Sequence, residues 1–187
     1  WVNLITDTFA AMALASLPPN ERVMQSNPRN RKYFIIAKPM GIMIASIGVL
    51  FFAFLMTLLY VFKHYDIKAF ADIFLFGEYR GGIGISPKEG SMFFTVFVML
   101  QFWNMFNAKA YMSGRSAFHF KNCGSFLLIA AIILAGQVAI VTFGGKMFSV
   151  TPLSVADWVV MIALTSLVMI LGELARFANN HCIKAKA

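Results

Sequence analysis

The chain has 187 residues and a formal net charge of +8, and 59% of its residues are hydrophobic while only 13% are charged. An ordinary soluble domain has roughly 45–50% apolar and about 25% charged residues, so this composition excludes a water-soluble globular protein and predicts an integral membrane protein. In such a protein the basic residues are a topology signal, and we do not expect a nucleic-acid partner.

The first predicted element is an apolar partial helix at residues 1–16, which ends before the two prolines that follow "ALASL". It begins with Trp1, which is not a natural initiator residue, and no positively charged region precedes its apolar run. We therefore expect no signal peptide. The stretch is interpreted as a membrane helix cut at its start, in a fragment of a longer membrane protein.

Three oxygen-bearing side chains interrupt this helix. Asn3, Thr6 and Asp7 are spaced i, i+3 and i+4, which places them on one face. Polar groups at membrane depth are costly and mark ion or substrate paths, and this hard-oxygen set suits Ca²⁺, which takes about 6–8 oxygen ligands, better than zinc or copper. One carboxylate is too few for a complete site, so other helices must contribute. The alternative, a helix-end cap or an interhelical hydrogen bond, stays open at this point.

A connector and the first complete span come next. The connector, "PPNERVMQSNPRN", contains prolines that prevent a continued helix. The span follows at residues 39–62, inside an uncharged run, and a spanning helix needs about 20 apolar residues. Beyond it, "HYDIKAFADIFLF" suggests a short amphipathic piece, and "FGEYRGGIGISPKEG" predicts an exterior loop. Its "GGIG" follows no strand and is interpreted as a flexible turn, not as a phosphate-binding loop.

The second complete span, at residues 91–110, contains amide side chains. Gln101 and Asn104 are spaced for one helix face, and their carbonyl oxygens make them accessory candidates for the cation site. Amides also hydrogen-bond across membrane helices, at about 1 kcal/mol each or less. Packing is the favoured interpretation of this pair taken alone, because no carboxylate accompanies it.

Two further spans complete the chain, at residues 123–143 and 154–176, and "FGGKMFSVTP" predicts a tight exterior turn between them. Gln137 stands alone in the first of these spans and is expected to hydrogen-bond between helices. Glu173 and Arg176 are spaced i, i+3 near the end of the last span, where we expect a structural ion pair rather than a proton relay.

Basic residues are unevenly divided among the connecting segments. The connector at 18–38 carries five basic residues against one acid, and the loop at 109–121 carries three against none, whereas the segment at 63–89 is balanced. The positive-inside rule then places the connector, the 109–121 loop and the C-terminal tail in the cytoplasm. The predicted fold is an all-α, polytopic membrane helix bundle with about five transmembrane helices, in which residues 1–187 form one membrane domain.

Several stretches together resemble a known family. "WVNLITDTFAAMALASLPP" with the basic "NPRNRK" is similar to the sixth membrane helix and following loop of calcium-transporting P-type ATPases. "FFTVFVMLQFWNMFNAKA" looks like the eighth helix of that family, and "FGGKMFSVTPLSVADW" like its turn between the ninth and tenth helices. The resemblance covers essentially the whole chain and is nearest to the plasma-membrane type, including bacterial relatives.

The resemblance implies roles for individual residues. Asn3, Thr6 and Asp7 match the family's "NLxTD" motif, whose Asn, Thr and Asp bind calcium on a partly unwound helix. Gln101 stands where the reticulum type of pump has a glutamate that completes an additional calcium site. The resemblance therefore implies one calcium ion per transport cycle.

The resemblance also implies what this chain lacks. The Asp-Lys-Thr-Gly-Thr phosphorylation motif of the family does not occur in these residues, so ATP and Mg²⁺ would act only through domains absent from this chain. The expected function is the membrane part of an ATP-driven calcium export pump, embedded in the lipid bilayer of a cell membrane, with a bacterial inner membrane expected, and partnered by the upstream parts of the same pump. The alternatives are a stand-alone cation channel or secondary transporter, or a P-type pump for another cation such as Mn²⁺.

Overall fold

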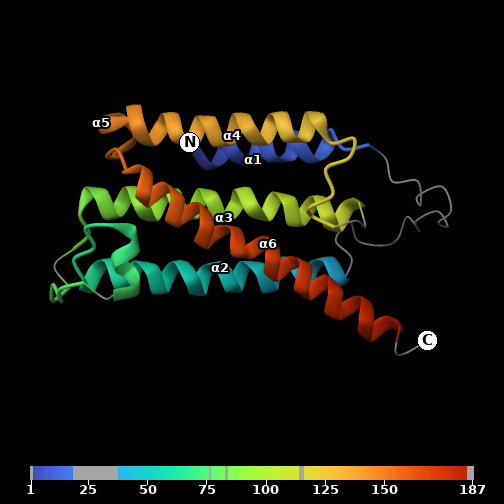
Figure 1. Cartoon of the computed structure of the whole chain (residues 1–187), viewed down its shortest axis with the longest axis horizontal. Coiled ribbons are helices and arrows are strands. Elements are labelled where there is room, and N and C mark those ends of the chain that lie inside the picture. Colours follow the sequence, from blue (N-terminus) through green and yellow to red (C-terminus); the bar gives the residue numbers. More distant parts are fainter. Residues whose placement is uncertain (1, 19–37, 76, 83, 114–115, 185–187) are drawn as a thin grey trace.

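The computed structural model describes residues 2–18, 38–75, 77–82, 84–113 and 116–184. Within these ranges the regular elements are all helical, which confirms the predicted all-α fold (Figure 1). They are α1 (Val2–Ala15), α2 (Lys38–His64), the 3-10 helix η2 (Phe70–Leu75), α3 (Pro87–Ser113), α4 (Gly124–Phe143), α5 (Gly145–Phe148) and α6 (Val155–Lys184). The connector predicted at 18–38 lies almost wholly outside the described residues.

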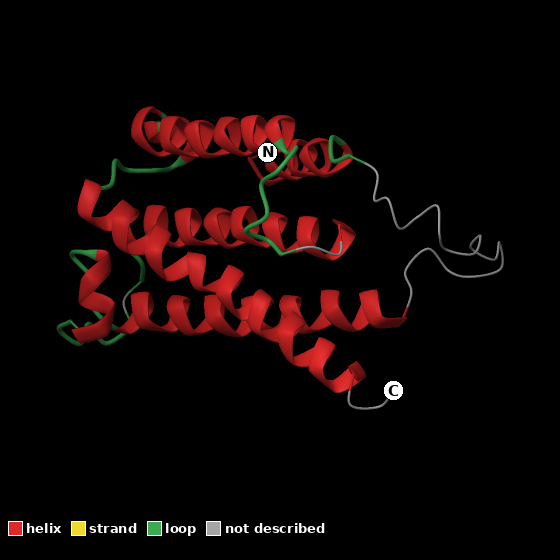
Figure 2. Cartoon of the chain, turned by 45° about the vertical axis from the view of Figure 1, so that its right-hand side comes forward, coloured by secondary structure: helices red, strands yellow, loops and turns green. Residues whose placement is uncertain are grey.

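The long helices form a bundle whose members alternate in direction along the chain. In Figure 1, α1, α3 and α6 run from left to right, and α2 and α4 run from right to left. The turned view in Figure 2 keeps the same side-by-side arrangement, with α3 between the α1–α4 pair and α2. This alternation is what consecutive passes through a bilayer require.

Three of the described helices are long and apolar enough to cross a membrane, at Met40–His64, Gly124–Phe143 and Val155–Phe177. Helix α3 is as long as α2 but is not among them, because amide side chains interrupt its apolar sequence. Its position explains how it carries them: α3 packs against α6, α1, α4 and α2, so it lies at the centre of the bundle. Helix α2 instead exposes large apolar side chains such as Ile42 and Phe52, as a lipid-facing helix does.

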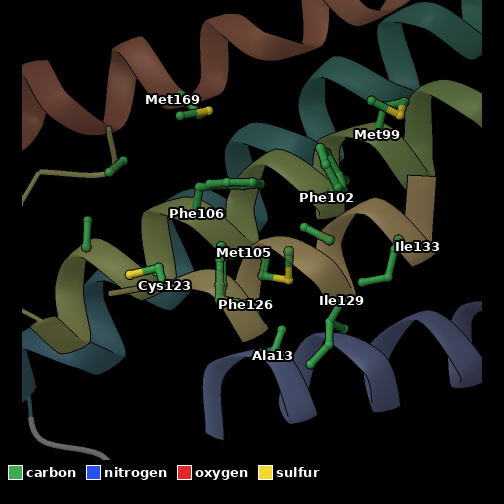
Figure 3. Close-up of a cluster of buried hydrophobic side chains, with 13 residues drawn as sticks. Ala13, Met99, Phe102, Met105, Phe106, Cys123, Phe126, Ile129, Ile133 and Met169 are labelled. Atoms are coloured by element: carbon green, nitrogen blue, oxygen red, sulfur yellow. The ribbon is translucent and has the colours of Figure 1, made fainter. Parts of the chain in front are cut away.

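A buried apolar cluster joins α1, α3 and α4 (Figure 3). Ala13 of α1 packs beside Ile129 of α4, and the aromatic rings of Phe106 and Phe126 meet edge to face with centroids 5.1 Å apart. Edge-to-face pairs of this kind add to the stabilisation that apolar burial provides. The cluster therefore fixes α1, which carries the candidate ligands, against its two neighbours.

Helices α3 and α6 begin at the same end of the bundle, and each begins with a capping box. Ser86 precedes α3, and its hydroxyl accepts a hydrogen bond from the Glu89 amide (3.2 Å) while the Glu89 carboxylate accepts from the Ser86 amide (2.6 Å). Ser154 and Asp157 repeat the arrangement before α6. These reciprocal bonds satisfy amides that have no partner inside the helix, and the Thr151 amide joins the two helix starts by donating to the Ser91 hydroxyl (2.8 Å).

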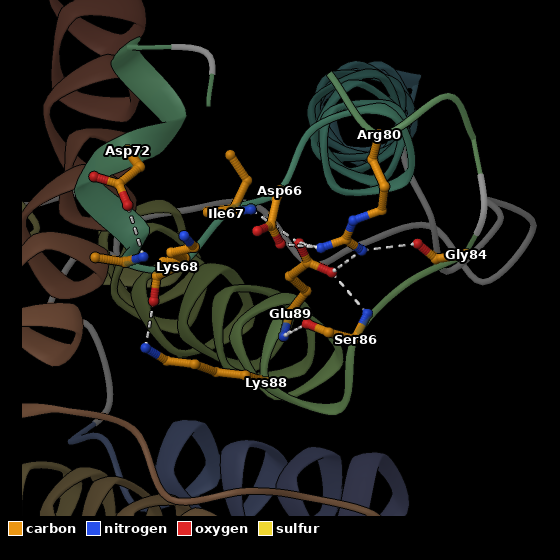
Figure 4. Close-up of polar contacts among 10 residues, drawn as sticks. Asp66, Ile67, Lys68, Asp72, Arg80, Gly84, Ser86, Lys88 and Glu89 are labelled. Atoms are coloured by element: carbon orange, nitrogen blue, oxygen red, sulfur yellow. Dashed lines mark hydrogen bonds and ion pairs between the residues drawn. The ribbon is translucent and has the colours of Figure 1, made fainter. Parts of the chain in front are cut away.

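Figure 4 shows the polar network that closes this end of the bundle. Arg80, from the loop before α3, lies between Asp66 and Glu89 and forms ion pairs with both. The hydrogen bonds that Arg80 donates to Asp66, which have the larger effect, and to Glu89 raise the pKa of its guanidinium above the ordinary value. The loop predicted from "FGEYRGGIGISPKEG" is thus held by a charge cluster in which Glu89 is buried while Arg80 and Asp66 are partly exposed. The short amphipathic piece predicted before it contains the 3-10 helix η2.

Candidate functional site

Helix α1 carries the three predicted ligands. It is a continuous helix over Val2–Ala15, so Asn3, Thr6 and Asp7 fall on neighbouring turns as their spacing predicts. The partial unwinding that the family resemblance implies is not present in this structure, and the sequence accounts for this because no glycine or proline interrupts α1. The Asn3 side chain lies outside the part of the structure that is described.

Thr6 and Asp7 have different surroundings. Thr6 is half-buried and lines a small cavity of about 120 Å³ between α1 and α4. Asp7 is exposed, because successive residues on a helix point about 100° apart and the packed side of α1 is the one that carries Phe9 and Ala13. The carboxylate is therefore open to groups from outside the described part of the chain.

Gln137 is the residue whose position near the candidate site the sequence did not reveal. The other residues of the Thr6 cavity are apolar or glycine, namely Phe9, Ile132, Ile133, Gly136 and Ile140, but Gln137 also lines it. Its side chain is only 3% exposed, and its Nε2 has no hydrogen-bond partner. A lone amide in an apolar helix predicted a contact between helices, yet nothing in its spacing pointed to Thr6.

The accessory candidates Gln101 and Asn104 lie on α3, which packs against α1. Both are half-buried, and the Asn104 Oδ1 is enclosed without a donor. An amide oxygen in this state is able to accept a hydrogen bond or to bind a cation. The structure thus brings the two candidate helices together, although it shows no hydrogen bond between the described candidates on α1 and those on α3.

Asn107, one turn further along α3, has a structural role. Its Nδ2 donates to the Val168 carbonyl (3.0 Å) and its Oδ1 accepts from Arg176 (3.2 Å). The predicted ion pair between Glu173 and Arg176 is present at 3.1 Å, and Glu173 also accepts hydrogen bonds from Ser116 and the Ala117 amide. These bonds fix α6 to α3 and to the loop after α3, so this group is interhelical packing and not an ion path.

The described residues do not complete a cation site by themselves. Among them, no three histidine, cysteine, aspartate or glutamate side chains are grouped to hold a metal ion. Asp7 is the single carboxylate of the candidate set, and Ca²⁺ needs about 6–8 oxygens. The arrangement can therefore supply part of a hard-cation site, with one negative charge and several neutral oxygens on two packed helices.

Comparison with known proteins gives the context. Residues 1–178 match the family described as "Cation transporting ATPase, C-terminus". The chain is 30% identical over 181 residues to the calcium-transporting ATPase PAT1 of Dictyostelium discoideum, covering 94% of this chain and 15% of that protein. It is 36% identical over 178 residues to plasma membrane calcium-transporting ATPase 2 of Oreochromis mossambicus, covering 93% of this chain and 15% of that protein.

The chain is also 36% identical over 162 residues to plasma membrane calcium-transporting ATPase 3 of Homo sapiens, covering 84% of this chain and 12% of that protein. The chain thus spans only 12–15% of the length of these relatives.

Proposed function

This chain belongs to the family of cation-transporting ATPase C-termini, and we propose that it is the C-terminal membrane part of an ATP-driven calcium export pump. The observation that carries the proposal is Asp7, a carboxylate within an apolar helix of the matched region, one residue after Thr6 and four after Asn3. The names of the relatives, all calcium-transporting ATPases, support calcium as the transported ion. The family match favours a pump over a stand-alone channel or secondary transporter.

In this proposal α1 supplies one share of the transport site. Asp7 provides the negative charge, and Asn3 and Thr6 provide neutral oxygens. Gln101 and Asn104 on α3 are accessory oxygen donors, and the free Oδ1 of Asn104 supports that assignment. The remaining ligands come from parts of the pump outside this chain, and the exposure of Asp7 supports such an arrangement.

In the proposed transport cycle the charge of Asp7 helps to hold the ion and then to release it. A calcium ion that enters from the cytoplasm is held by Asp7 together with the neutral oxygens. ATP and Mg²⁺ act through the parts of the pump outside this chain, where phosphorylation drives the helices to tilt. Because Asp7 is the charged ligand that α1 contributes, a small displacement of α1 weakens binding and releases the ion on the other side.

The proposal includes a location. Relatives named as plasma membrane pumps support a cell membrane, and in a bacterium this is the inner membrane. The partners are the lipid bilayer, which the exposed apolar side chains of α2 fit, and the upstream domains and helices of the same pump.

Substitution of Asp7 in the full-length protein tests the proposal. We expect Asp7→Asn to abolish calcium-dependent phosphorylation from ATP, because the amide keeps the shape of the side chain but removes its charge. Glu78→Gln, in the exposed loop before α3, is the matched control and should leave calcium dependence unchanged. Normal calcium binding and transport by Asp7→Asn would show that the site assignment is wrong, and activation of the unmodified protein by Mn²⁺ but not Ca²⁺ would show that the ion is wrong.

A further inference from the structure

The cavity between α1 and α4 brings together two polar side chains that are far apart in the sequence. Thr6 is on α1, directly before Asp7, and Gln137 is on α4. The other lining residues offer no polar side chain. Any polar interaction inside this cavity therefore involves Thr6, Gln137 or the backbone.

Gln137 needs a partner that the apolar lining does not supply. Its side chain is 97% enclosed, since only 3% is exposed, and its Nε2 donor has no hydrogen-bond partner in the structure. The great majority of buried amide groups in proteins are hydrogen-bonded, because a buried donor without an acceptor has lost its water without any compensating bond. The Gln137 amide therefore points to a polar group or a small polar molecule beside it, and Thr6 is the other polar side chain that lines the cavity.

Water fits the cavity in size and in chemistry. A water molecule occupies about 30 Å³ and needs two or more polar partners, and the cavity volume is about 120 Å³. The Thr6 hydroxyl is both a donor and an acceptor, so one or two waters are able to link it to the Gln137 amide. Bridges of this kind are nearly as favourable in enthalpy as a direct hydrogen bond.

We propose that Gln137 is a positioning residue for the cation site, and that its amide, through water held in this cavity, fixes the Thr6 side of α1 against α4. This inference rests on the proposed function, because its consequence concerns Asp7. Thr6 and Asp7 are separated by about 100° around the helix, so a contact that fixes Thr6 toward α4 also sets the direction of the Asp7 carboxylate. Without that contact the apolar cluster around Ala13 still holds α1, but the turn that carries Thr6 loses its polar link to α4, and the carboxylate is less well placed for the ion.

The test uses the intact pump in membrane vesicles. Four variants are compared: Gln137→Leu, Gln137→Asn, Thr6→Val, and Gln137→Leu combined with Thr6→Val. The readouts are the calcium concentration for half-maximal phosphorylation and the maximal phosphorylation level. Val138→Leu is the matched control, because Val138 is the next residue on α4 but is 41% exposed.

We expect Gln137→Leu to raise the half-activating calcium concentration about fivefold, in line with the loss of one hydrogen-bonded link, with the maximal level unchanged. Thr6→Val should raise it at least as much, because it also removes a proposed ligand oxygen. The double variant should be no worse than Thr6→Val alone, because both substitutions remove the same link. Gln137→Asn should restore near-normal calcium dependence, since water fills the space left by its shorter side chain. If Gln137→Leu does not reach the membrane, the other two single variants still test the inference: Thr6→Val should weaken calcium activation, and Gln137→Asn should leave it near normal.

Three results would overturn the inference. The first is normal calcium dependence in Gln137→Leu or in Thr6→Val, and the second is that the effects of these two substitutions multiply in the double variant. The third is a Gln137→Asn defect as large as that of Gln137→Leu, which would indicate packing alone. The parallel Asp7→Asn variant separates the two proposals. If it retains normal calcium dependence, the proposed function fails; if it is inactive while Gln137→Leu is normal, only the role of Gln137 fails.

Discussion

Arg80 and Glu89 form a two-point ion pair, in which Nη1 lies 3.1 Å from Oε2 and Nη2 lies 3.1 Å from Oε1. The Glu89 side chain is 0% exposed, and it also accepts hydrogen bonds from the amides of Ile67 (3.0 Å) and Ser86 (2.6 Å). A buried carboxylate is tolerated only when its charge is paired and its oxygens are satisfied. This pair therefore holds the loop before α3, the end of α2 and the start of α3 in one arrangement.

Glu89→Gln is expected to destabilise this end of the bundle. The amide would remove one of the two charges that pair with Arg80 and would place an NH₂ group against donors, so the loss should be about 1–3 kcal/mol, the cost of an unsatisfied buried polar group. The measurement is the apparent melting temperature of the intact protein in detergent, which should fall by several degrees. Glu78→Gln makes the same charge change at an exposed position and should leave the melting temperature unchanged. Equal melting temperatures for the two variants would contradict a structural role for Glu89.

Arg80 leads to a prediction about pH. Its pKa is raised by its hydrogen bonds to Asp66 and Glu89, so its contribution to stability is fully present at neutral pH and is lost only in strongly alkaline solution. In Arg80→His the ordinary pKa is about 6.5, and the same carboxylates should raise it in the folded state. The stabilising contribution of that histidine is then present below about pH 6.5 and disappears as the pH rises through the raised value.

The check compares the melting temperatures of Arg80→His and the unmodified protein across about pH 5.5–9. The deficit of the variant should be small at the acidic end and should grow as the pH rises. Parallel curves would show that residue 80 does not interact electrostatically with Asp66 and Glu89.

The sequence predicts the fold better than it predicts the surroundings of individual charges. Long uncharged runs reveal α2 and α4 because burial in lipid requires them, and the i, i+3, i+4 spacing places the candidate ligands of α1 on one side of a helix. Lys109 shows the limit. Its charge contributed to the predicted topology, yet its Nζ is buried and donates to the carbonyls of Ala117 (3.1 Å) and His119 (2.7 Å). Carbonyls that converge from a folded loop leave no pattern in a sequence.

The same limit applies to the candidate site. Asn3, Thr6 and Asp7 are neighbours on one helix, so their spacing alone groups them. Gln137 lines the same cavity as Thr6 only because α4 packs against α1, and that packing depends on the shapes of apolar side chains such as Ala13 and Ile129. Local periodicity carries no information about which apolar faces meet.

Gly172 of α6 is expected to tolerate no larger side chain. A Cβ atom added there would lie 2.2 Å from Oδ1 and 2.6 Å from Cγ of Asn107. Asn107 is unable to move away without breaking its bonds to Val168 and Arg176. Gly172→Ala should therefore cost about 1–3 kcal/mol through overpacking and lower the melting temperature. Gly48→Ala in α2, where an added Cβ meets nothing within 4 Å, is the control and should be neutral or slightly stabilising. A stable Gly172→Ala protein would show that α3 and α6 pack less closely than described.

Gln101 determines the expected number of ions per cycle. It is a neutral amide on α3, at the position where the family resemblance places the glutamate of an additional calcium site. This chain therefore contributes the carboxylate of Asp7 but no acidic side chain at that position for a second ion. We therefore expect the full-length pump, reconstituted in sealed vesicles, to move close to one calcium ion for each ATP hydrolysed. Gln101→Ala removes the amide oxygen but no charge, so it should weaken calcium affinity while leaving this ratio near one. A ratio near two in the unmodified pump would contradict the assignment, because a second calcium ion would need acidic ligands that neither α1 nor α3 provides at these positions.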